Sequence, residues 1–207
     1  MILKTIPAGP LEVNCHIIGS STGDGVLVID PGGDSRIILD WIAKKGKQIT
    51  GVIATHGHFD HVGGVNELTG GGNIPFYIHE ADLPLLRNVT VQAAQFGLDC
   101  PAIATAPHFL ADNATLPLED LEIRVIHTPG HSPGCICLYC EAHGYLITGD
   151  TLFRESVGRT DLPGGDFETL VNSITRRLMT LPDTVTIHPG HGPASTLRHE
   201  RINNPFI

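Results

Sequence analysis

The chain has an excess of acidic over basic residues, few aromatic residues and no long apolar run. It carries 13 lysine and arginine residues against 22 aspartate and glutamate residues, and its formal net charge is −9 at pH 7. The basic residues form no block, which argues against nucleic acid or an anionic membrane as the main partner. No run approaches the roughly 18 consecutive apolar residues that cross a bilayer, so no membrane-spanning helix is expected.

The N-terminal segment and the cysteines indicate a reducing compartment. Met1–Pro7 has one lysine and no apolar stretch long enough for a signal peptide, so a cytoplasmic location is expected. The five cysteines are an odd number, which argues against a disulfide framework. Cys135, Cys137 and Cys140 fall within one predicted strand. We interpret them as small buried apolar side chains, with a thiolate site near a metal as the alternative.

The composition is that of a globular protein with a sizeable core, because 41% of the 207 residues are hydrophobic and 17% are charged. Apolar periodicity and glycine or proline punctuation predict alternating strands and helices. The predicted strands are 2–6, 13–18, 26–29, 51–54, 74–78, 123–127, 135–140, 144–148 and 184–188. The predicted helices are 34–46, 60–68, 81–88, 91–97, 166–181 and 195–203. Residues 100–118 are predicted to form a long loop over the site that selects the substrate.

Four of the predicted strands end in turns that carry metal-ligand side chains. These side chains are His56, His58, Asp60 and His61 after the strand at 51–54, His131 after 123–126, Asp150 after 145–147 and His191 after 184–187. Four polar groups within six residues, directly after an apolar strand, are hard to explain by packing, because burying them without partners is costly. If the strands share one edge, five imidazoles and two carboxylates converge there.

Imidazole and carboxylate ligands without thiolate suit zinc, iron or manganese. Seven ligands are too many for one tetrahedral ion and suit two. Structural zinc sites are closed and usually rich in cysteine, so this open set indicates a catalytic site. The sequence therefore predicts two divalent metal ions, with zinc first and iron or manganese as alternatives.

The other histidines are interpreted without a metal. His16, His127 and His188 lie near strand ends and are expected in the core or behind the ligands. Surface positions are expected for the remaining four, which are His79, His108, His143 and His199.

With these residues assembled, the chain resembles the metallo-β-lactamase superfamily over nearly its whole length. The stretch His56–His61, then His131, Asp150 and His191 in the family's order, and the turn Asp30-Pro31-Gly32 carry the resemblance. It implies an α/β fold, a four-layer αββα sandwich with two mixed sheets and helices outside, in which residues 1–207 form a single domain. By analogy, one ion would be held by His56, His58 and His131 and the other by Asp60, His61 and His191. Asp150 would bridge the two ions, and Asp30 would support the ligands from behind.

Within the superfamily the chain is most similar to short glyoxalase II-like (hydroxyacylglutathione hydrolase-like) proteins, on residues 149–153, 158–161, 189–193 and 200–205. The similarity implies hydrolysis of a small thioester such as S-D-lactoylglutathione, with metal-bound hydroxide as the nucleophile and Asp60 as the catalytic residue that orients it. The expected partner is a small thiol-derived molecule, with a glutathione conjugate as candidate. Full-length glyoxalase II grips glutathione with a C-terminal helical domain that has no counterpart in these 207 residues, which leaves open how glutathione would be held.

Three alternatives stay open at this point. Arg159 either holds a substrate carboxylate through paired hydrogen bonds or forms a salt bridge with Asp161 or Asp166. A persulfide dioxygenase would hold one iron on His56, His131 and Asp150, with positions free for oxygen. A non-catalytic metal-binding or sensor module on the same fold is the candidate from another class, because a fold alone does not fix function.

Overall fold

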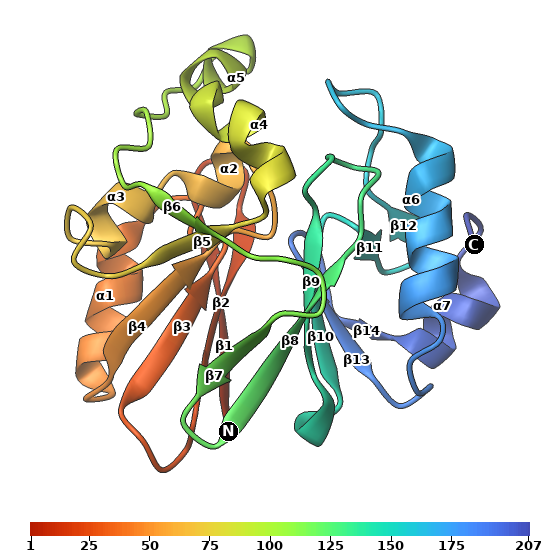
Figure 1. The fold of residues 1–207 in the computed structure, drawn as a ribbon, viewed down its shortest axis with the longest axis horizontal. Helices are drawn as coiled ribbons and strands as arrows, with labels where there is room; N and C mark the ends of the chain where they lie inside the picture. The colour runs from red at the N-terminus through yellow and green to blue at the C-terminus, as the bar shows by residue number, and fades with distance from the viewer.

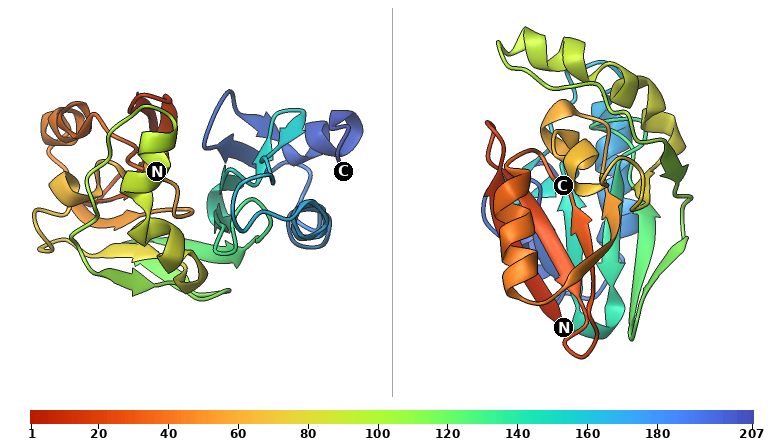
Figure 2. Two further views of the ribbon diagram at one scale, coloured as in Figure 1. Left: turned by 90° about the horizontal axis from the view of Figure 1, so that it is seen from above. Right: turned by 90° about the vertical axis from the view of Figure 1, so that its left-hand side faces the viewer.

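The computed structural model describes residues 1–207, apart from the side chain of Pro117, as two mixed six-stranded sheets packed face to face with helices outside (Figures 1 and 2). The first sheet has the strand order β1 (Ile2–Ala8), β2 (Val13–Gly19), β3 (Gly25–Ile29), β4 (Gln48–Ile53), β5 (Phe76–Ile78) and β6 (Pro107–Phe109). The second has the order β14 (Ser195–Thr196), β13 (Thr186–Pro189), β10 (Tyr145–Gly149), β9 (Ile136–Cys140), β8 (Leu121–His127) and β7 (Thr115–Leu118). A two-stranded ribbon joins β11 (Leu152–Phe153) to β12 (Ser156–Val157). The predicted αββα sandwich is confirmed.

Helices lie on the outer side of each sheet, and others stand at the ends of the strands (Figures 1 and 2). Those of the first half are α1 (Ser35–Lys44), α2 (Phe59–Val62), α3 (Val65–Leu68), η1 (Glu80–Asp82), α4 (Leu83–Arg87) and α5 (Val89–Gln95). Those of the second half are η2 (Glu141–His143), α6 (Phe167–Ser173), which continues as the π-helix η3 (Ile174–Leu178), and α7 (Leu197–Asn203). No helix among the described residues is long and apolar enough to cross a membrane.

Three apolar layers hold the sandwich together, and strand alternation divides residues among them. On β3, Val28 faces α1 and Leu27 faces the second sheet. On β9, Leu138 faces the first sheet, whereas Cys137 faces α6 and η3. All five cysteines are free and buried, which confirms their interpretation as small apolar side chains.

The two sheets meet at the edge where the ligand-bearing strands end. Strands β3, β4 and β5 run parallel, so their carboxyl ends lie side by side, and β10 and β13 are parallel in the second sheet. The backbone amide of Ile136, at the start of β9, donates a 2.9 Å hydrogen bond to the carbonyl of Thr55, just after β4. The fold therefore brings turns from both halves to one place.

Two local predictions are wrong. The segment 100–118 is no lid over the site, because β6 joins the first sheet and β7 joins the second, and none of its residues lines the cavity beside the ligands. The predicted helix 60–68 is two short helices, interrupted at Gly63 and Gly64. The residue before α1, Asp34, makes no side-chain cap; its carboxylate accepts a 2.9 Å hydrogen bond from the Gly9 amide.

Candidate metal centre

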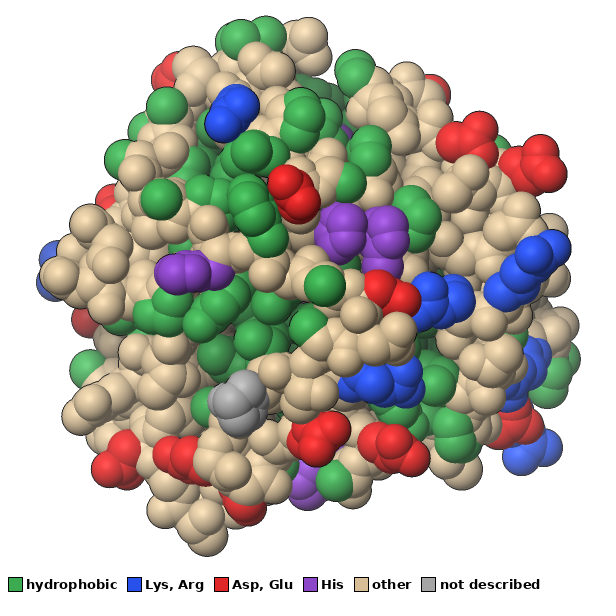
Figure 3. Space-filling model, in the orientation of Figure 1, with side chains coloured by type: hydrophobic (Ala, Val, Ile, Leu, Met, Phe, Trp, Pro, Cys, Tyr) green, Lys and Arg blue, Asp and Glu red, His purple; other side chains and the backbone are tan. Residues whose placement is uncertain are grey.

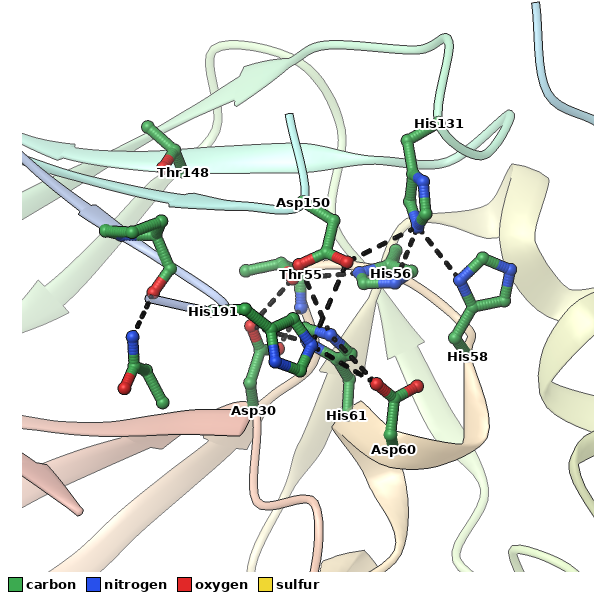
Figure 4. A network of polar contacts seen from close by, with 12 residues as sticks. Asp30, Thr55, His56, His58, Asp60, His61, His131, Thr148, Asp150 and His191 are labelled. Carbon is green, nitrogen blue, oxygen red and sulfur yellow. Dashed lines mark hydrogen bonds and ion pairs between the residues drawn. The ribbon is translucent and has the colours of Figure 1, made fainter. Parts of the chain in front are cut away.

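The seven predicted ligand residues converge at the shared edge of the two sheets (Figure 4). Their ligand atoms form three overlapping groups, each within 4.8 Å: His56, His58 and His131; His56, His61 and Asp150; Asp60, His61 and His191. The four ligands His56, His58, Asp60 and His61 follow β4 of the first sheet. The other three follow strands of the second sheet: His131 follows β8, Asp150 follows β10 and His191 follows β13. Side chains from both halves of the chain thus meet around one point.

The first group places three ring nitrogens against one another. Nε2 of His131 lies 3.0 Å from Nδ1 of His58 and 3.2 Å from Nε2 of His56. A neutral imidazole has one donor and one acceptor nitrogen. Three ring nitrogens that face one another at these distances therefore cannot all be paired by hydrogen bonds among themselves. A cation that accepts all three lone pairs resolves the conflict, and the donor set suits zinc or iron.

The other two groups combine imidazoles with carboxylates. Nε2 of His61 lies 3.4 Å from Oδ1 of Asp150 and 3.7 Å from Oδ2 of Asp60, while Nε2 of His191 lies 3.3 Å from the same Asp60 oxygen. Nε2 of His61 and Oδ1 of Asp150 are buried and have no hydrogen-bond partner. Unpartnered buried polar atoms are unfavourable, so these residues fit a divalent ion between them.

Protons are distributed unevenly among the candidate ligands. Burial, reinforced by His131, lowers the pKa of His58 to about 3, and burial with His61 lowers the pKa of His56 well below its usual value. Burial opposes a charge on His61 as well, yet the carboxylates of Asp30, Asp150 and Asp60 together raise the pKa of His61 to about 10. His56 and His58 therefore present neutral nitrogens, whereas an ion that binds His61 must displace its proton.

Asp30 orients two of the candidate ligands from behind. Its carboxylate accepts hydrogen bonds from the Thr55 amide at 2.6 Å and the Thr55 hydroxyl at 2.7 Å, and lies 3.1 Å from Nδ1 of His61. The same hydroxyl oxygen lies 3.1 Å from Nδ1 of His56. Nδ1 of each ring thus faces Asp30 or Thr55 and Nε2 points toward the centre, which is the usual arrangement behind metal-binding histidines.

Arg159 contributes its backbone to the centre and its side chain to the surface beside it. Nδ1 of His131 donates to the Arg159 carbonyl at 2.7 Å, which leaves Nε2 free for a metal. The guanidinium donates to both carboxylate oxygens of Asp161 at 2.7 Å each. Of the two roles considered from the sequence, the structure thus shows the salt bridge, with Asp161 as partner.

Asp82 was missed from the sequence, although it holds two ligand-bearing loops together. Its buried carboxylate accepts hydrogen bonds from the Gly57 amide at 2.8 Å, the Ser132 hydroxyl at 2.6 Å and the Gly134 amide at 2.6 Å. Gly57 lies between His56 and His58, and Ser132 follows His131. One signal was available: Asp82 follows β5, the parallel neighbour of β4, and so lies at the edge where the other strands end.

The turn that carries His191 is held by β2. Nδ2 of Asn14 donates to the carbonyls of Pro189 and Gly192 at 3.0 and 2.8 Å, and its backbone amide donates to Gly190 at 2.6 Å. His16 is buried, and its Nε2 lies 3.2 Å from the Pro189 carbonyl, so it acts behind the ligands as expected.

Gly190 has no room for a side chain, because an added Cβ would lie 2.4 Å from Oδ1 of Asp150 and 2.8 Å from the His61 ring. The turn can therefore approach the centre only with glycine at this position.

A cavity of about 710 Å³ opens beside the centre. Five of the seven candidate ligands line it: His58, Asp60, His131, Asp150 and His191. The site thus has a side accessible to a small molecule, which fits catalysis better than a closed structural role.

The stacked rings of His79 and His127, with centroids 4.0 Å apart, lie outside this ligand set.

The chain resembles proteins of known name and structure along its full length. It is 33% identical to the hydroxyacylglutathione hydrolase GloC of Haemophilus influenzae, over all of this chain and 98% of that protein. The solved B3 metallo-β-lactamase BLEG-1 superposes with a TM-score of 0.92 and 33% identity, covering 99% of each chain. TTHA1623, solved in a di-iron-bound form, superposes with a TM-score of 0.90 and 36% identity, covering 99% of this chain and all of that one.

The family profile of the metallo-β-lactamase superfamily matches residues 8–191, a span that includes every candidate ligand. The sandwich fold, the ligand cluster at its edge and this match agree with one another. The chain therefore belongs to the metallo-β-lactamase superfamily of metal-dependent hydrolases.

Proposed function

We propose that the protein is a two-metal hydrolase of small thioesters, for which S-D-lactoylglutathione serves as the reference substrate. The observation that carries the proposal is the convergence of seven candidate ligands in overlapping groups beside one open cavity, with Asp150 placed between His61 and His131. The relationship to a hydroxyacylglutathione hydrolase supports thioester hydrolysis as the reaction.

Hydrolysis forms a bond between the thioester carbon and a water oxygen and breaks the bond between that carbon and sulfur. Two divalent ions at the site would lower the pKa of water toward about 7 and stabilise the charge that develops on the carbonyl oxygen. His56, His58 and His131 would hold one ion, and Asp60, His61 and His191 the other. The donor set does not decide between zinc, iron and manganese.

The chain's own contribution to the reaction is orientation. Burial opposes ionisation of Asp60, but His61 and His191 hold the pKa of its carboxyl well below the usual range. The ionised carboxylate lines the cavity, where it can accept a hydrogen bond from the attacking water and fix its direction. The departing thiol has a pKa of about 8.5, so it can leave as the thiolate without a dedicated general acid.

The persulfide dioxygenase alternative needs one iron on His56, His131 and Asp150. In this structure Asp60, His61 and His191 converge on the same place, and these further donors favour two ions over one. Oxygen uptake with a persulfide, together with one iron per chain, would support the dioxygenase instead.

The test of the proposal compares variants loaded with zinc, iron or manganese. We expect Asp60→Asn and His58→Ala to abolish turnover of S-D-lactoylglutathione, because one loses the orienting carboxylate and the other a candidate ligand. His143→Ala removes an exposed histidine on η2 and should leave turnover unchanged. Turnover that survives in both site variants, or preferential cleavage of a β-lactam by the wild-type protein, would contradict the proposal.

A further inference from the structure

The cavity beside the candidate metal centre is walled mainly by hydrocarbon. Besides the ligands, its lining includes the apolar side chains of Leu11, Leu85, Val91, Phe96, Phe153 and Leu162. These come from the β1–β2 loop, from α4 and α5 and from the segments that follow β10. Apolar side chains also border the notch between the two halves at the top of Figure 3. The wall therefore favours an uncharged apolar group in contact with α5.

Three apolar side chains that line the cavity are partly exposed to water. Val91 is 58% exposed, Phe96 is 48% exposed and Leu11 is 40% exposed. Contiguous exposed apolar surface of this kind commonly marks a ligand site. A bound apolar group would cover these side chains and gain the free energy of removing them from water.

The cavity offers little to an anion. Arg159 is the one lysine or arginine among the described residues that line it, and Asp161 already engages its guanidinium through two hydrogen bonds. Glutathione has two carboxylates and one ammonium group at neutral pH, and proteins usually bind carboxylates through arginine or lysine.

The volume of about 710 Å³ is that of a site for a sizeable small molecule. A lactoyl group on the metals would leave most of it unfilled. The remaining space adjoins α5, whose cavity-facing polar side chains, Gln92 and Gln95, are neutral.

We propose that the physiological substrate is a thioester whose larger part is uncharged and apolar, packed against Leu11, Val91 and Phe96, rather than a glutathione thioester. The inference rests on the proposed thioester hydrolysis and names its substrate class. The apolar part can belong to the thiol or to the acyl group, and the assay below separates the two.

The experiment measures kcat/KM of the metal-loaded protein for four thioesters that combine a lactoyl or hexanoyl group with glutathione or benzyl mercaptan. If the apolar part is the thiol, kcat/KM for the lactoyl thioester of benzyl mercaptan should exceed kcat/KM for lactoylglutathione by about tenfold or more. An apolar acyl side predicts the same advantage for hexanoylglutathione. If lactoylglutathione equals or exceeds both, the inference is overturned.

A variant that adds a positive charge tests the apolar lining of the cavity. Val91→Lys places a cation at an exposed position of α5, so it should lower kcat/KM for the preferred apolar thioester about tenfold and raise it for lactoylglutathione. The matched control is Ile37→Lys, which makes the same kind of change at a 55% exposed position of α1 away from the cavity, and it should change neither value. Equal effects of both variants would overturn the inference.

A binding measurement separates this inference from the proposed function. If none of the four thioesters is cleaved, the proposed function fails. Calorimetry with two uncleavable thioethers, S-hexylglutathione and an uncharged hexyl benzyl thioether, still decides the preference of the cavity. Tighter binding of S-hexylglutathione would reject an apolar, uncharged ligand.

Discussion

At the scale of single residues, the centre consists of ligands aimed by buried polar neighbours. Asp30 and Thr55 orient His61 and His56, and the Arg159 carbonyl orients His131. Each contact engages Nδ1 and directs Nε2 inward. Replacing a neighbour should therefore weaken metal binding even where every ligand is retained.

His16 gives a residue-scale prediction for the pH dependence of stability. Burial lowers the pKa of His16 to about 4 although Asp30 acts in the opposite direction, whereas the unfolded chain has an ordinary histidine near pH 6.5. Between these values the unfolded state binds more protons, so stability falls as the pH is lowered from about 6.5 to 4. The loss from this group approaches about 3 kcal/mol at pH 4.

Urea unfolding at several pH values checks this prediction. His16→Gln keeps a hydrogen-bonding side chain but cannot be protonated, so the free energy of unfolding should depend less on pH between 4 and 6.5 than in the wild type. His143→Gln, at an exposed position, serves as control and should follow the wild type. A His16→Gln profile parallel to that of the wild type would show that His16 is not the group responsible.

At the scale of elements, the centre depends on loops from one sheet held by residues of the other. Asp82 at the end of η1 binds both the loop after β4 and the loop before β9. Asn14 on β2 binds the turn after β13. These contacts fix the distances between ligands that lie on different loops. No single loop could set those distances.

Asp82→Asn should loosen the group formed by His56, His58 and His131. An amide at this position presents N–H groups where three donors already point, so about 2–3 kcal/mol of stability should be lost. We expect the ion of that group to be lost first, while Asp60, His61 and His191 keep theirs. Metal content by mass spectrometry and the visible spectrum of the cobalt-substituted protein report the change.

Leu178→Ala is the control for a general loss of stability. It removes a fully buried side chain of η3, in the apolar cluster with Leu170 and Ile187, at a cost of about 2–5 kcal/mol. It should retain both ions. Equal metal loss in Leu178→Ala and Asp82→Asn would mean that the effect of Asp82 is only through stability.

At the scale of the whole molecule, the candidate metals join the two halves. His56, His58, Asp60 and His61 belong to the first half, and His131, Asp150 and His191 to the second. The folded state alone brings them together, so bound metal stabilises it by mass action. The same edge also forms the cavity, so folding, metal binding and substrate access are coupled.

Removing the metal should lower the melting temperature. A ligand at a thousandfold excess over its dissociation constant contributes about 4 kcal/mol, which corresponds to about 10 °C for a chain of this size. Calorimetric melting with and without a chelator measures the shift, and His131→Ala, which lacks a ligand from the second half, should show a smaller one. A wild-type melting temperature insensitive to chelation would contradict this coupling.

The sequence by itself determined most strands, the principal helices and the seven candidate ligands, because apolar periodicity, glycine turns and ligand spacing are local. It did not reveal that 100–118 divides between two sheets, nor that Asp82 and Asn14 hold the ligand loops. Those roles depend on contacts between residues far apart in the chain, such as Asn14 with Pro189, 175 positions away. Only the tertiary structure decided them, because the direction of a buried side chain and the shape of a cavity are set by packing across the whole fold.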